Sequence, residues 1–211
     1  MGPGIELTFV DFVSYLIPGF LVVAPATWLW MQRSSAAAWG SVVLTALLLV
    51  SFFVGFTLYH LAAYIVDGTY HIATSKYPTQ VMVEGFPQYS MVRTRLLNDL
   101  ELDSSIKSID VYLWLRTWTT DSAPKSLAQA ERVAYLSGFA RVLAFTVPIS
   151  AILLGLAAGR RNVTAISISL AGLAVVLVSI FLFRTYWVLS QVSVHQTMRS
   201  FLVNTSKAII Q

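Results

Sequence analysis

Two arginines at the ends of apolar runs are the residues best placed to do chemistry in this sequence. Arg141 stands just before the run from Val142 to Ala158, and Arg184 ends a second run. An ionisable side chain at membrane depth is costly, so it normally extends to the lipid phosphates, is paired, or is functional. Repeated around the axis of an oligomer, such arginines form rings of positive charge that select anions. Asp11, at the start of the first apolar window, is either a partner for these arginines or an ordinary interfacial acid.

A second set of residues combines aromatic rings with guanidinium groups in the polar middle of the chain. Aromatic faces stack on nucleic-acid bases, and guanidinium groups bind phosphate. The alternative interpretation is that the tryptophans are core residues or lie flat on the membrane interface. The candidate ligand-binding residues are Arg93, Arg95, Trp114, Arg116 and Trp118, with Tyr77 and Tyr89 nearby.

The sequence offers little for catalysis. It has no cysteine, which excludes disulfides, thiolate metal sites and cysteine nucleophiles. The three histidines, His60, His71 and His195, do not have metal-ligand spacing. No HExxH or GxSxG motif and no glycine-rich phosphate loop is present. We therefore expect a protein that is not an enzyme and that has no catalytic residue, metal site or cofactor.

Composition places all of these residues in an integral membrane protein. Of the 211 residues, 56% are hydrophobic and only 11% are charged, and the mean hydropathy is +0.70. Soluble domains carry about 25% charged residues. A membrane-spanning helix needs about 20 mainly apolar residues, and four windows qualify: 9–30, 40–66, 136–158 and 163–184. Pro18 and Pro25 inside the first window predict a kinked or partly interfacial helix.

The last two apolar helices are predicted to extend well beyond their windows. No helix breaker follows Pro124 until Pro148, so residues 123–158 are predicted to form one helix. Asp121 or Ser122 is the expected N-cap of that helix. The C-terminal tail is expected to continue the fourth helix in the same way. Two such extensions would couple the polar region mechanically to the membrane hairpin.

Residues 67–121 are too polar to cross a membrane. The alternation in "TQVMVE", followed by glycine and proline, predicts a short strand or extended turn. Residues 90–101 have the spacing of a short amphipathic helix. Residues 104–118 are ambiguous: the first half favours a helix, whereas a strand would place both tryptophans and Arg116 on one side.

Positive charge sets the expected orientation. Four spans put both termini and residues 67–135 on one face of the membrane, where most lysines and arginines lie. The positive-inside rule then makes this face cytoplasmic. The expected fold class is an all-α membrane protein whose four transmembrane helices form two hairpins, with a small, mostly helical cytoplasmic insert between spans 2 and 3. The expected segments are a first hairpin (1–66), the insert (67–122), the long third helix with the second hairpin (123–190), and a cytoplasmic tail (191–211).

Small residues on the spans point to close helix packing. Ala151, Gly155 and Gly159 are each four residues apart, and Ser51 and Gly55 repeat this spacing. Such patterns let helices approach closely, most often within one protomer. Together with the long helix that enters the second hairpin, they favour a cyclic homo-oligomer, which we expect to be a tetramer.

Two classes of function fit these features. The first is an oligomeric channel whose cytoplasmic part senses a ligand, which accounts for the small size, the arginines at matched depth and the missing catalytic motifs. The second is a membrane adaptor that recruits a partner through residues 67–121. A transporter is less consistent with the sequence, because four spans are few and no inverted repeat is visible.

The layout of the chain also resembles a known family. The opening "FVDFVSYLIPGFLVV", a second span, a soluble insert of about 65 residues and a closing "GRRN" turn are similar to the small four-span membrane effectors of bacterial anti-phage defence. The membrane components of Hailong systems are the most similar of these. The resemblance implies a tetrameric, anion-preferring channel in the bacterial inner membrane, held shut by a single-stranded deoxyadenylate oligomer. It also implies an operon-encoded nucleotidyltransferase as partner; a cyclic nucleotide is the other ligand that we consider.

Overall fold

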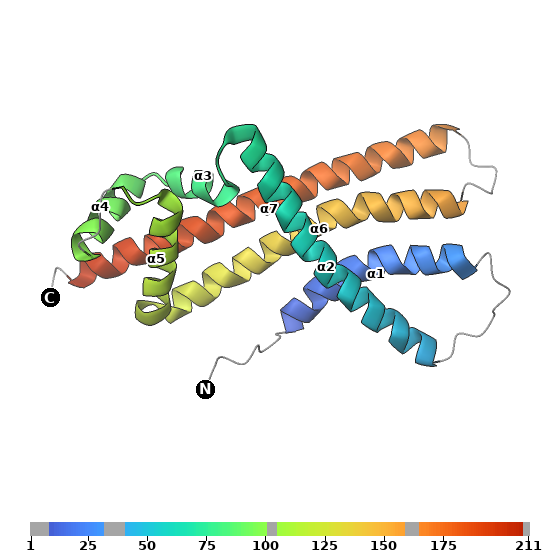
Figure 1. The fold of residues 1–211 in the computed structure, drawn as a ribbon, viewed down its shortest axis with the longest axis horizontal. Helices are drawn as coiled ribbons and strands as arrows, with labels where there is room; N and C mark the ends of the chain where they lie inside the picture. Colours follow the sequence, from blue (N-terminus) through green and yellow to red (C-terminus); the bar gives the residue numbers. More distant parts are fainter. Residues whose placement is uncertain (1–8, 32–40, 101–104, 159–164, 209–211) are drawn as a thin grey trace. The chain divides into compact units, whose positions relative to one another are not determined.

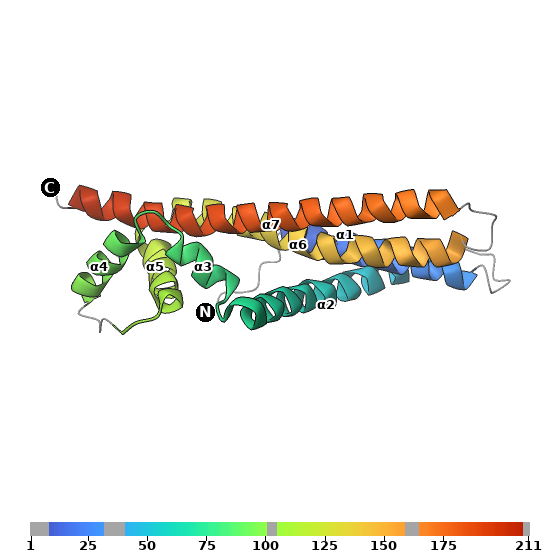
Figure 2. The same cartoon turned by 90° about the horizontal axis from the view of Figure 1, so that it is seen from above.

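A computed structural model describes residues 9–31, 41–100, 105–158 and 165–208. These residues form seven α-helices (Figures 1 and 2). The helices are α1 (Phe9–Met31), α2 (Ser41–Thr74), α3 (Pro78–Glu84), α4 (Tyr89–Leu100), α5 (Ser108–Ser122), α6 (Pro124–Ala158) and α7 (Ala165–Ala208). Within the described ranges the protein contains no strand, which confirms the all-α class.

Four of the helices are long and apolar enough to cross a membrane. They are Phe12–Trp30 in α1, Leu44–Thr74 in α2, Pro124–Leu156 in α6 and Ser169–Thr205 in α7. Each overlaps one of the four apolar windows of the sequence, and the last three extend beyond theirs, so the chain has the helices of a multi-pass membrane protein. Helix α1 continues through Pro18 and Pro25, so these prolines do not end it.

The predicted continuity of the last two long helices is confirmed. Helix α6 begins at Pro124, and α7 spans 44 residues, or about 66 Å at 1.5 Å per residue. The predicted N-cap of α6 is wrong, because Asp121 and Ser122 belong to the end of α5. Instead, the carbonyl of Ala123 accepts hydrogen bonds from the backbone N–H groups of two residues in the first turn of α6. The predicted turn at 159–162 lies outside the described residues.

The predicted strand around "TQVMVE" is also wrong, because this segment forms α3. Tyr77 has an extended backbone, and Pro78 follows at the first helical position, where its fixed φ suits a helix start. The N–H of Gly85 then bonds to the Val81 carbonyl and closes the last turn. The amphipathic helix predicted at 90–101 is confirmed as α4, and the ambiguous segment is helical from Ser108 onward, where α5 begins.

The chain divides into two compact units. Unit 1 comprises residues 1–65 and 138–186, and unit 2 comprises residues 66–137 and 187–211. Each unit therefore draws on two separate segments, and α2, α6 and α7 contribute residues to both.

The core of unit 2 is an apolar cluster built from α3, α4, α5 and the C-terminal part of α7 (Figure 2). Its most deeply buried members include Val83, Val92, Val111, Leu115 and Met198, which are all fully enclosed. In the same unit, α6 and α7 pack antiparallel: the Ser190 hydroxyl bonds to Ser137 over 3.0 Å, and the Ser193 hydroxyl donates to the Ala130 carbonyl over 2.8 Å.

In unit 1, α1 and α2 cross backbone to backbone. A Cβ on Gly19 would collide with the Ser51 carbonyl, and a Cβ on Gly55 would collide with the Tyr15 carbonyl. Ser51 is completely buried at this crossing. The small-residue pattern of the second span is therefore used inside one protomer, as small residues are in most membrane helix pairs. By contrast, no atom of the described residues lies within 4 Å of the position of a Cβ on Gly155 of α6.

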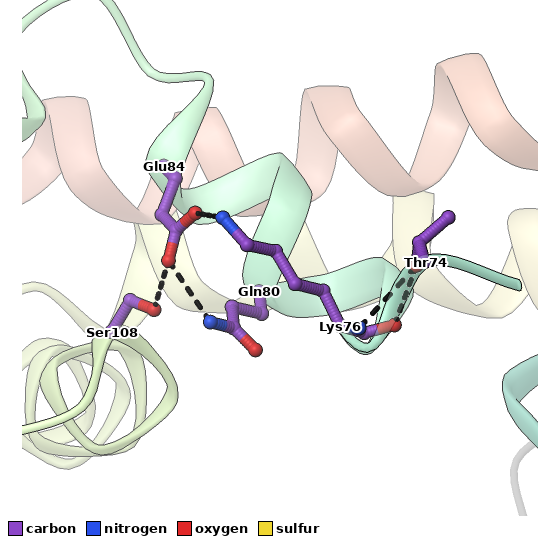
Figure 3. A network of polar contacts seen from close by, with 5 residues as sticks. All are labelled: Thr74, Lys76, Gln80, Glu84 and Ser108. Atoms are coloured by element: carbon purple, nitrogen blue, oxygen red, sulfur yellow. Dashed lines mark hydrogen bonds and ion pairs between the residues drawn. The ribbon is translucent and has the colours of Figure 1, made fainter. Parts of the chain in front are cut away.

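A polar network around Glu84 joins three elements of unit 2 (Figure 3). The two carboxylate oxygens of Glu84 accept hydrogen bonds from Lys76 Nζ at 2.6 Å, Ser108 Oγ at 2.8 Å and Gln80 Nε2 at 3.0 Å. Thr74 at the end of α2 bonds to the backbone of Lys76. The hydrogen bond from Lys76 is the main reason that the pKa of Glu84 falls from 4.5 to about 2, and the Gln80 and Ser108 bonds contribute further.

Replacing Glu84 with glutamine should therefore remove a pH-dependent part of the stability. The native pKa is depressed, so the contribution of Glu84 is fully present above pH 4.5 and is lost as the pH falls toward about 2. Partly exposed ion pairs contribute about 0.2–1 kcal/mol, or about 1–4 °C in Tm for a chain of this size. In detergent, the Tm of wild type should be above that of Glu84→Gln at neutral pH, and the difference in Tm should shrink in acid.

The matched control for this prediction is Asp121→Asn, which removes an exposed carboxylate from unit 2. It should leave the difference from wild type nearly constant over the same pH range. If the Tm difference between wild type and Glu84→Gln does not shrink in acid, the ionised carboxylate of Glu84 does not stabilise the polar network.

Candidate functional site

Arg141 lies between two tyrosine rings inside unit 1. Its guanidinium carbon is 5.3 Å from the ring centroid of Tyr186 on α7 and 5.8 Å from that of Tyr59 on α2. Tyr186 is only 5% exposed. The Nε atom of Arg141 is buried and has no hydrogen-bond partner within the described ranges. The arginine is thus surrounded by aromatic faces contributed by two other helices.

The sequence of α6 makes room for this arrangement. Gly138 precedes Arg141 by about one helical turn, and the hydroxyl end of Tyr59 occupies the place that a Cβ at Gly138 would need. The ring of Tyr59 in turn packs edge-on against Tyr15 of α1, with 5.3 Å between centroids. Three helices besides α6 therefore contribute aromatic side chains to the surroundings of Arg141: α1, α2 and α7.

The electrostatics of this site are unusual for a membrane helix. Arg141 lies within a candidate membrane span, where a charge is expensive and normally pairs with another charge or with carbonyl groups. Among the described side chains no carboxylate lies within ion-pair distance of Arg141. Aromatic faces stabilise a guanidinium through their quadrupoles, by about 2 kcal/mol or more when water is excluded. The rings themselves carry no net charge, so these contacts do not neutralise the guanidinium.

The other two predicted pore residues lie in different surroundings. Arg184 is on α7 with an exposed side chain, and within the described ranges it makes no ion pair. Asp11 is in α1, but its side chain lies outside the part that the structure describes. The predicted pairing of Asp11 with either arginine therefore stays a prediction.

The structure does not gather the predicted ligand-binding residues of α5 into one surface. In a helix, residues two apart point in nearly opposite directions, so Arg116 does not share a face with the two tryptophans. Arg116 instead bonds to Glu131 of α6 at 3.1 Å. Trp118 packs edge-on against Phe201 in the core of unit 2. Trp114 is 46% exposed, so it is the member of this group that is free to meet a ligand.

The two arginines of α4 are both engaged within unit 2. Arg93 donates to the Ile106 carbonyl at 3.2 Å, and Arg95 bonds to the Thr205 hydroxyl at 3.3 Å. Arg93 also lines a shallow depression of about 340 Å3 along α4, together with Tyr89, Ser90, Thr94 and Leu97. Tyr77, the remaining aromatic residue of the predicted set, stacks on His71 with the rings 4.4 Å apart.

The described side chains contain no group of His, Asp and Glu residues that could hold a metal ion. His195 is occupied in the core of unit 2, where Nε2 lies 3.2 Å from the Met82 carbonyl and the ring packs edge-on against Phe86. The histidines therefore provide packing and stacking contacts in this fold.

Large apolar side chains are exposed along the membrane part of α7. Only 6% of its most apolar window is buried inside the chain. Leu173, Leu177, Ile180 and Phe181 are each more than half exposed. Gly172 on the same helix has open space at the position of a Cβ. These faces of α7 are available to lipid or to another copy of the chain.

Neither a family model, nor a curated protein, nor a solved structure matches this chain.

Sequence reasoning identified Arg141 but missed the residues around it. Tyr59 continues the stripe of Ser51 and Gly55 on α2 at four-residue spacing, which was a signal that it faces a neighbouring helix. Tyr186 lies just after the fourth apolar window, and nothing in that position links it to Arg141. Its burial and its contact with Arg141 depend on the antiparallel register of α6 and α7, which the sequence does not specify.

Proposed function

We propose that this chain is the subunit of an oligomeric, anion-preferring ion channel in the bacterial inner membrane. The observation that carries the proposal is that Arg141, on a helix apolar enough to span a membrane, contacts two tyrosine rings and has no carboxylate within ion-pair distance among the described side chains. An arginine in a membrane-spanning helix normally pairs with another charge or with carbonyl groups. Ring contacts do not cancel the positive charge, so it remains able to attract an anion.

Selectivity in this proposal comes from repetition of the arginines around a pore. One positive charge per subunit, focused between low-dielectric walls, raises the local concentration of anions and repels cations. Arg184 adds a second, exposed positive charge on α7. A tetramer is the assembly that we propose, and the exposed apolar face and open glycine of α7 support contacts between subunits.

The polar helices α3, α4 and α5 belong to the cytoplasmic, ligand-sensing part in this proposal. We place both termini and residues 67–135 in the cytoplasm, on the basis of the lysine and arginine distribution. The proposed ligand is a nucleotide or a short oligodeoxyadenylate produced by a partner nucleotidyltransferase, and the proposed role is defence against phage. Arg93, which lines the depression on α4, and the exposed Trp114 are the residues that best support ligand contact.

Reconstitution into vesicles tests conduction directly. Purified protein in vesicles loaded with a chloride-sensitive dye should dissipate a chloride gradient faster than protein-free vesicles. Mass measurement in detergent should give a multiple of the 23.3 kDa subunit. A protein that is monomeric and leaves the gradient intact would overturn the proposal.

The second candidate is a membrane adaptor that recruits a cytoplasmic partner through residues 67–121. It is favoured by two adjacent apolar side chains of α5, Leu113 at 52% and Trp114 at 46% exposure. An adaptor would bind its partner without any flux in vesicles, so the same assay separates the two functions.

A further inference from the structure

Two tyrosines from different helices contact one guanidinium in unit 1, and neither was expected from the sequence to have a role. Resting on the channel proposed above, we propose that Tyr59 and Tyr186 are positioning residues that hold the Arg141 guanidinium between their rings and thereby set anion selectivity. The contacts that carry this inference are the two ring-to-guanidinium distances of 5.8 and 5.3 Å.

An arginine without such contacts would not keep its charge in one place. Its side chain is long and flexible, and near a membrane surface it extends its head toward water or lipid phosphates. The burial of Nε and of Tyr186 shows that Arg141 turns into unit 1. A fixed charge gives each subunit the same potential at the same place, which a selectivity ring requires.

Holding the guanidinium with tyrosine rings has a functional consequence that a carboxylate would not have. A carboxylate would hold the guanidinium equally well but would cancel its charge. A ring face stabilises the cation by its quadrupole and carries no net charge. Gly138 and Tyr15 help to place the Tyr59 ring. Gly138 leaves space for it, and Tyr15 packs against it edge-on.

Ring-retaining and ring-removing substitutions test the proposal. The variants are Tyr59→Phe, Tyr186→Phe, Tyr59→Leu and Tyr186→Leu. The matched control is Tyr64→Leu, which removes a tyrosine from α2 whose side chain is 80% exposed. The first measurement is the rate at which phenylglyoxal modifies Arg141, read by peptide mass spectrometry in detergent, with exposed Arg184 as internal reference. The second is the chloride-over-potassium permeability ratio in planar bilayers.

In wild type, the phenylalanine variants and the control, phenylglyoxal should modify Arg141 several-fold more slowly than Arg184. These proteins should also keep the wild-type chloride-over-potassium permeability ratio. In the leucine variants Arg141 should lose most of this protection from phenylglyoxal. Their chloride-over-potassium permeability ratio should fall toward one. Leucine variants that retain protection would overturn the positioning role. Leucine variants that lose protection but keep their selectivity would overturn its link to selectivity. A wild type that does not conduct would refute the channel, whereas the protection pattern would still confirm or refute the positioning role.

Discussion

Channels carrying Arg141→Glu should lose their preference for anions and conduct cations better than chloride. The substitution replaces a positive by a negative charge in every subunit. At an effective dielectric constant of about 20, two unit charges about 4 Å apart interact by about 4 kcal/mol, and about 1.4 kcal/mol changes a ratio tenfold. We therefore expect the chloride-over-potassium permeability ratio to change by at least about tenfold, measured from the reversal potential in planar bilayers.

Three comparisons sharpen this prediction. Arg184→Glu should shift the ratio in the same direction. Arg141→Gln, which removes the charge without reversing it, should give an intermediate ratio. Arg132→Glu is the matched control, because Arg132 is an exposed arginine of the same helix that belongs to unit 2. Unchanged reversal potentials in both Arg141→Glu and Arg184→Glu would mean that these arginines only anchor the chain to lipid.

Gly55→Ala should destabilise the protein strongly, although alanine is the better helix former. In an unhindered helix this exchange is favourable by about 1 kcal/mol. At Gly55, however, the new methyl group would collide with the backbone carbonyl of Tyr15. A backbone carbonyl cannot relieve the collision by changing a side-chain rotamer. Overpacking of this kind typically costs about 1–3 kcal/mol. We expect a Tm several degrees below wild type in detergent, and Gly19→Ala should behave alike.

The matched control for the helix crossing is Gly68→Ala on the same helix. Gly68 has open space where its Cβ would lie, so the exchange should be neutral or stabilising. A Tm for Gly55→Ala equal to or above that of Gly68→Ala would contradict the close crossing of α1 and α2.

The long helices could be predicted because their signals are local. The lack of a breaker between Pro124 and Pro148 was enough to predict that the third long helix begins well before its apolar window, and α6 also continues through Pro148. Helix α7 likewise continues past its apolar window. The error at "TQVMVE" also has a local cause. Two-residue alternation of valines over a short segment outweighed Pro78, whose position at the first turn was the more specific signal.

The surroundings of Arg141 could not be predicted, because they depend on register between helices far apart in the chain. The cost of a charge in a membrane helix raised the question of a partner for Arg141. The sequence offered Asp11 either as that partner or as an ordinary interfacial acid, which stays open because its side chain lies outside the described residues. The structure places the rings of Tyr59 and Tyr186 against the guanidinium. Periodicity defines the face of a helix on which a residue lies but not the side chain that contacts it. The charge pattern does not reveal these contacts either, because a tyrosine ring carries no charge.

The same limit applies to the proposed ligand site. Trp114, Arg116 and Trp118 would lie on one side only in an extended chain, and in the helix of α5 Arg116 does not share a face with the two tryptophans. The pairing of Arg116 with Glu131 and the packing of Trp118 on Phe201 are tertiary contacts. Arg93 at the depression on α4 is the predicted arginine that keeps a place at a candidate pocket.

The reversal potential of the wild-type protein in a planar bilayer is the most direct test of the central claim. With a KCl gradient across the bilayer, an anion-preferring channel should give a reversal potential close to the chloride equilibrium potential. A conductance that reverses near the potassium equilibrium potential would contradict the role proposed for Arg141, and so would the absence of any conductance.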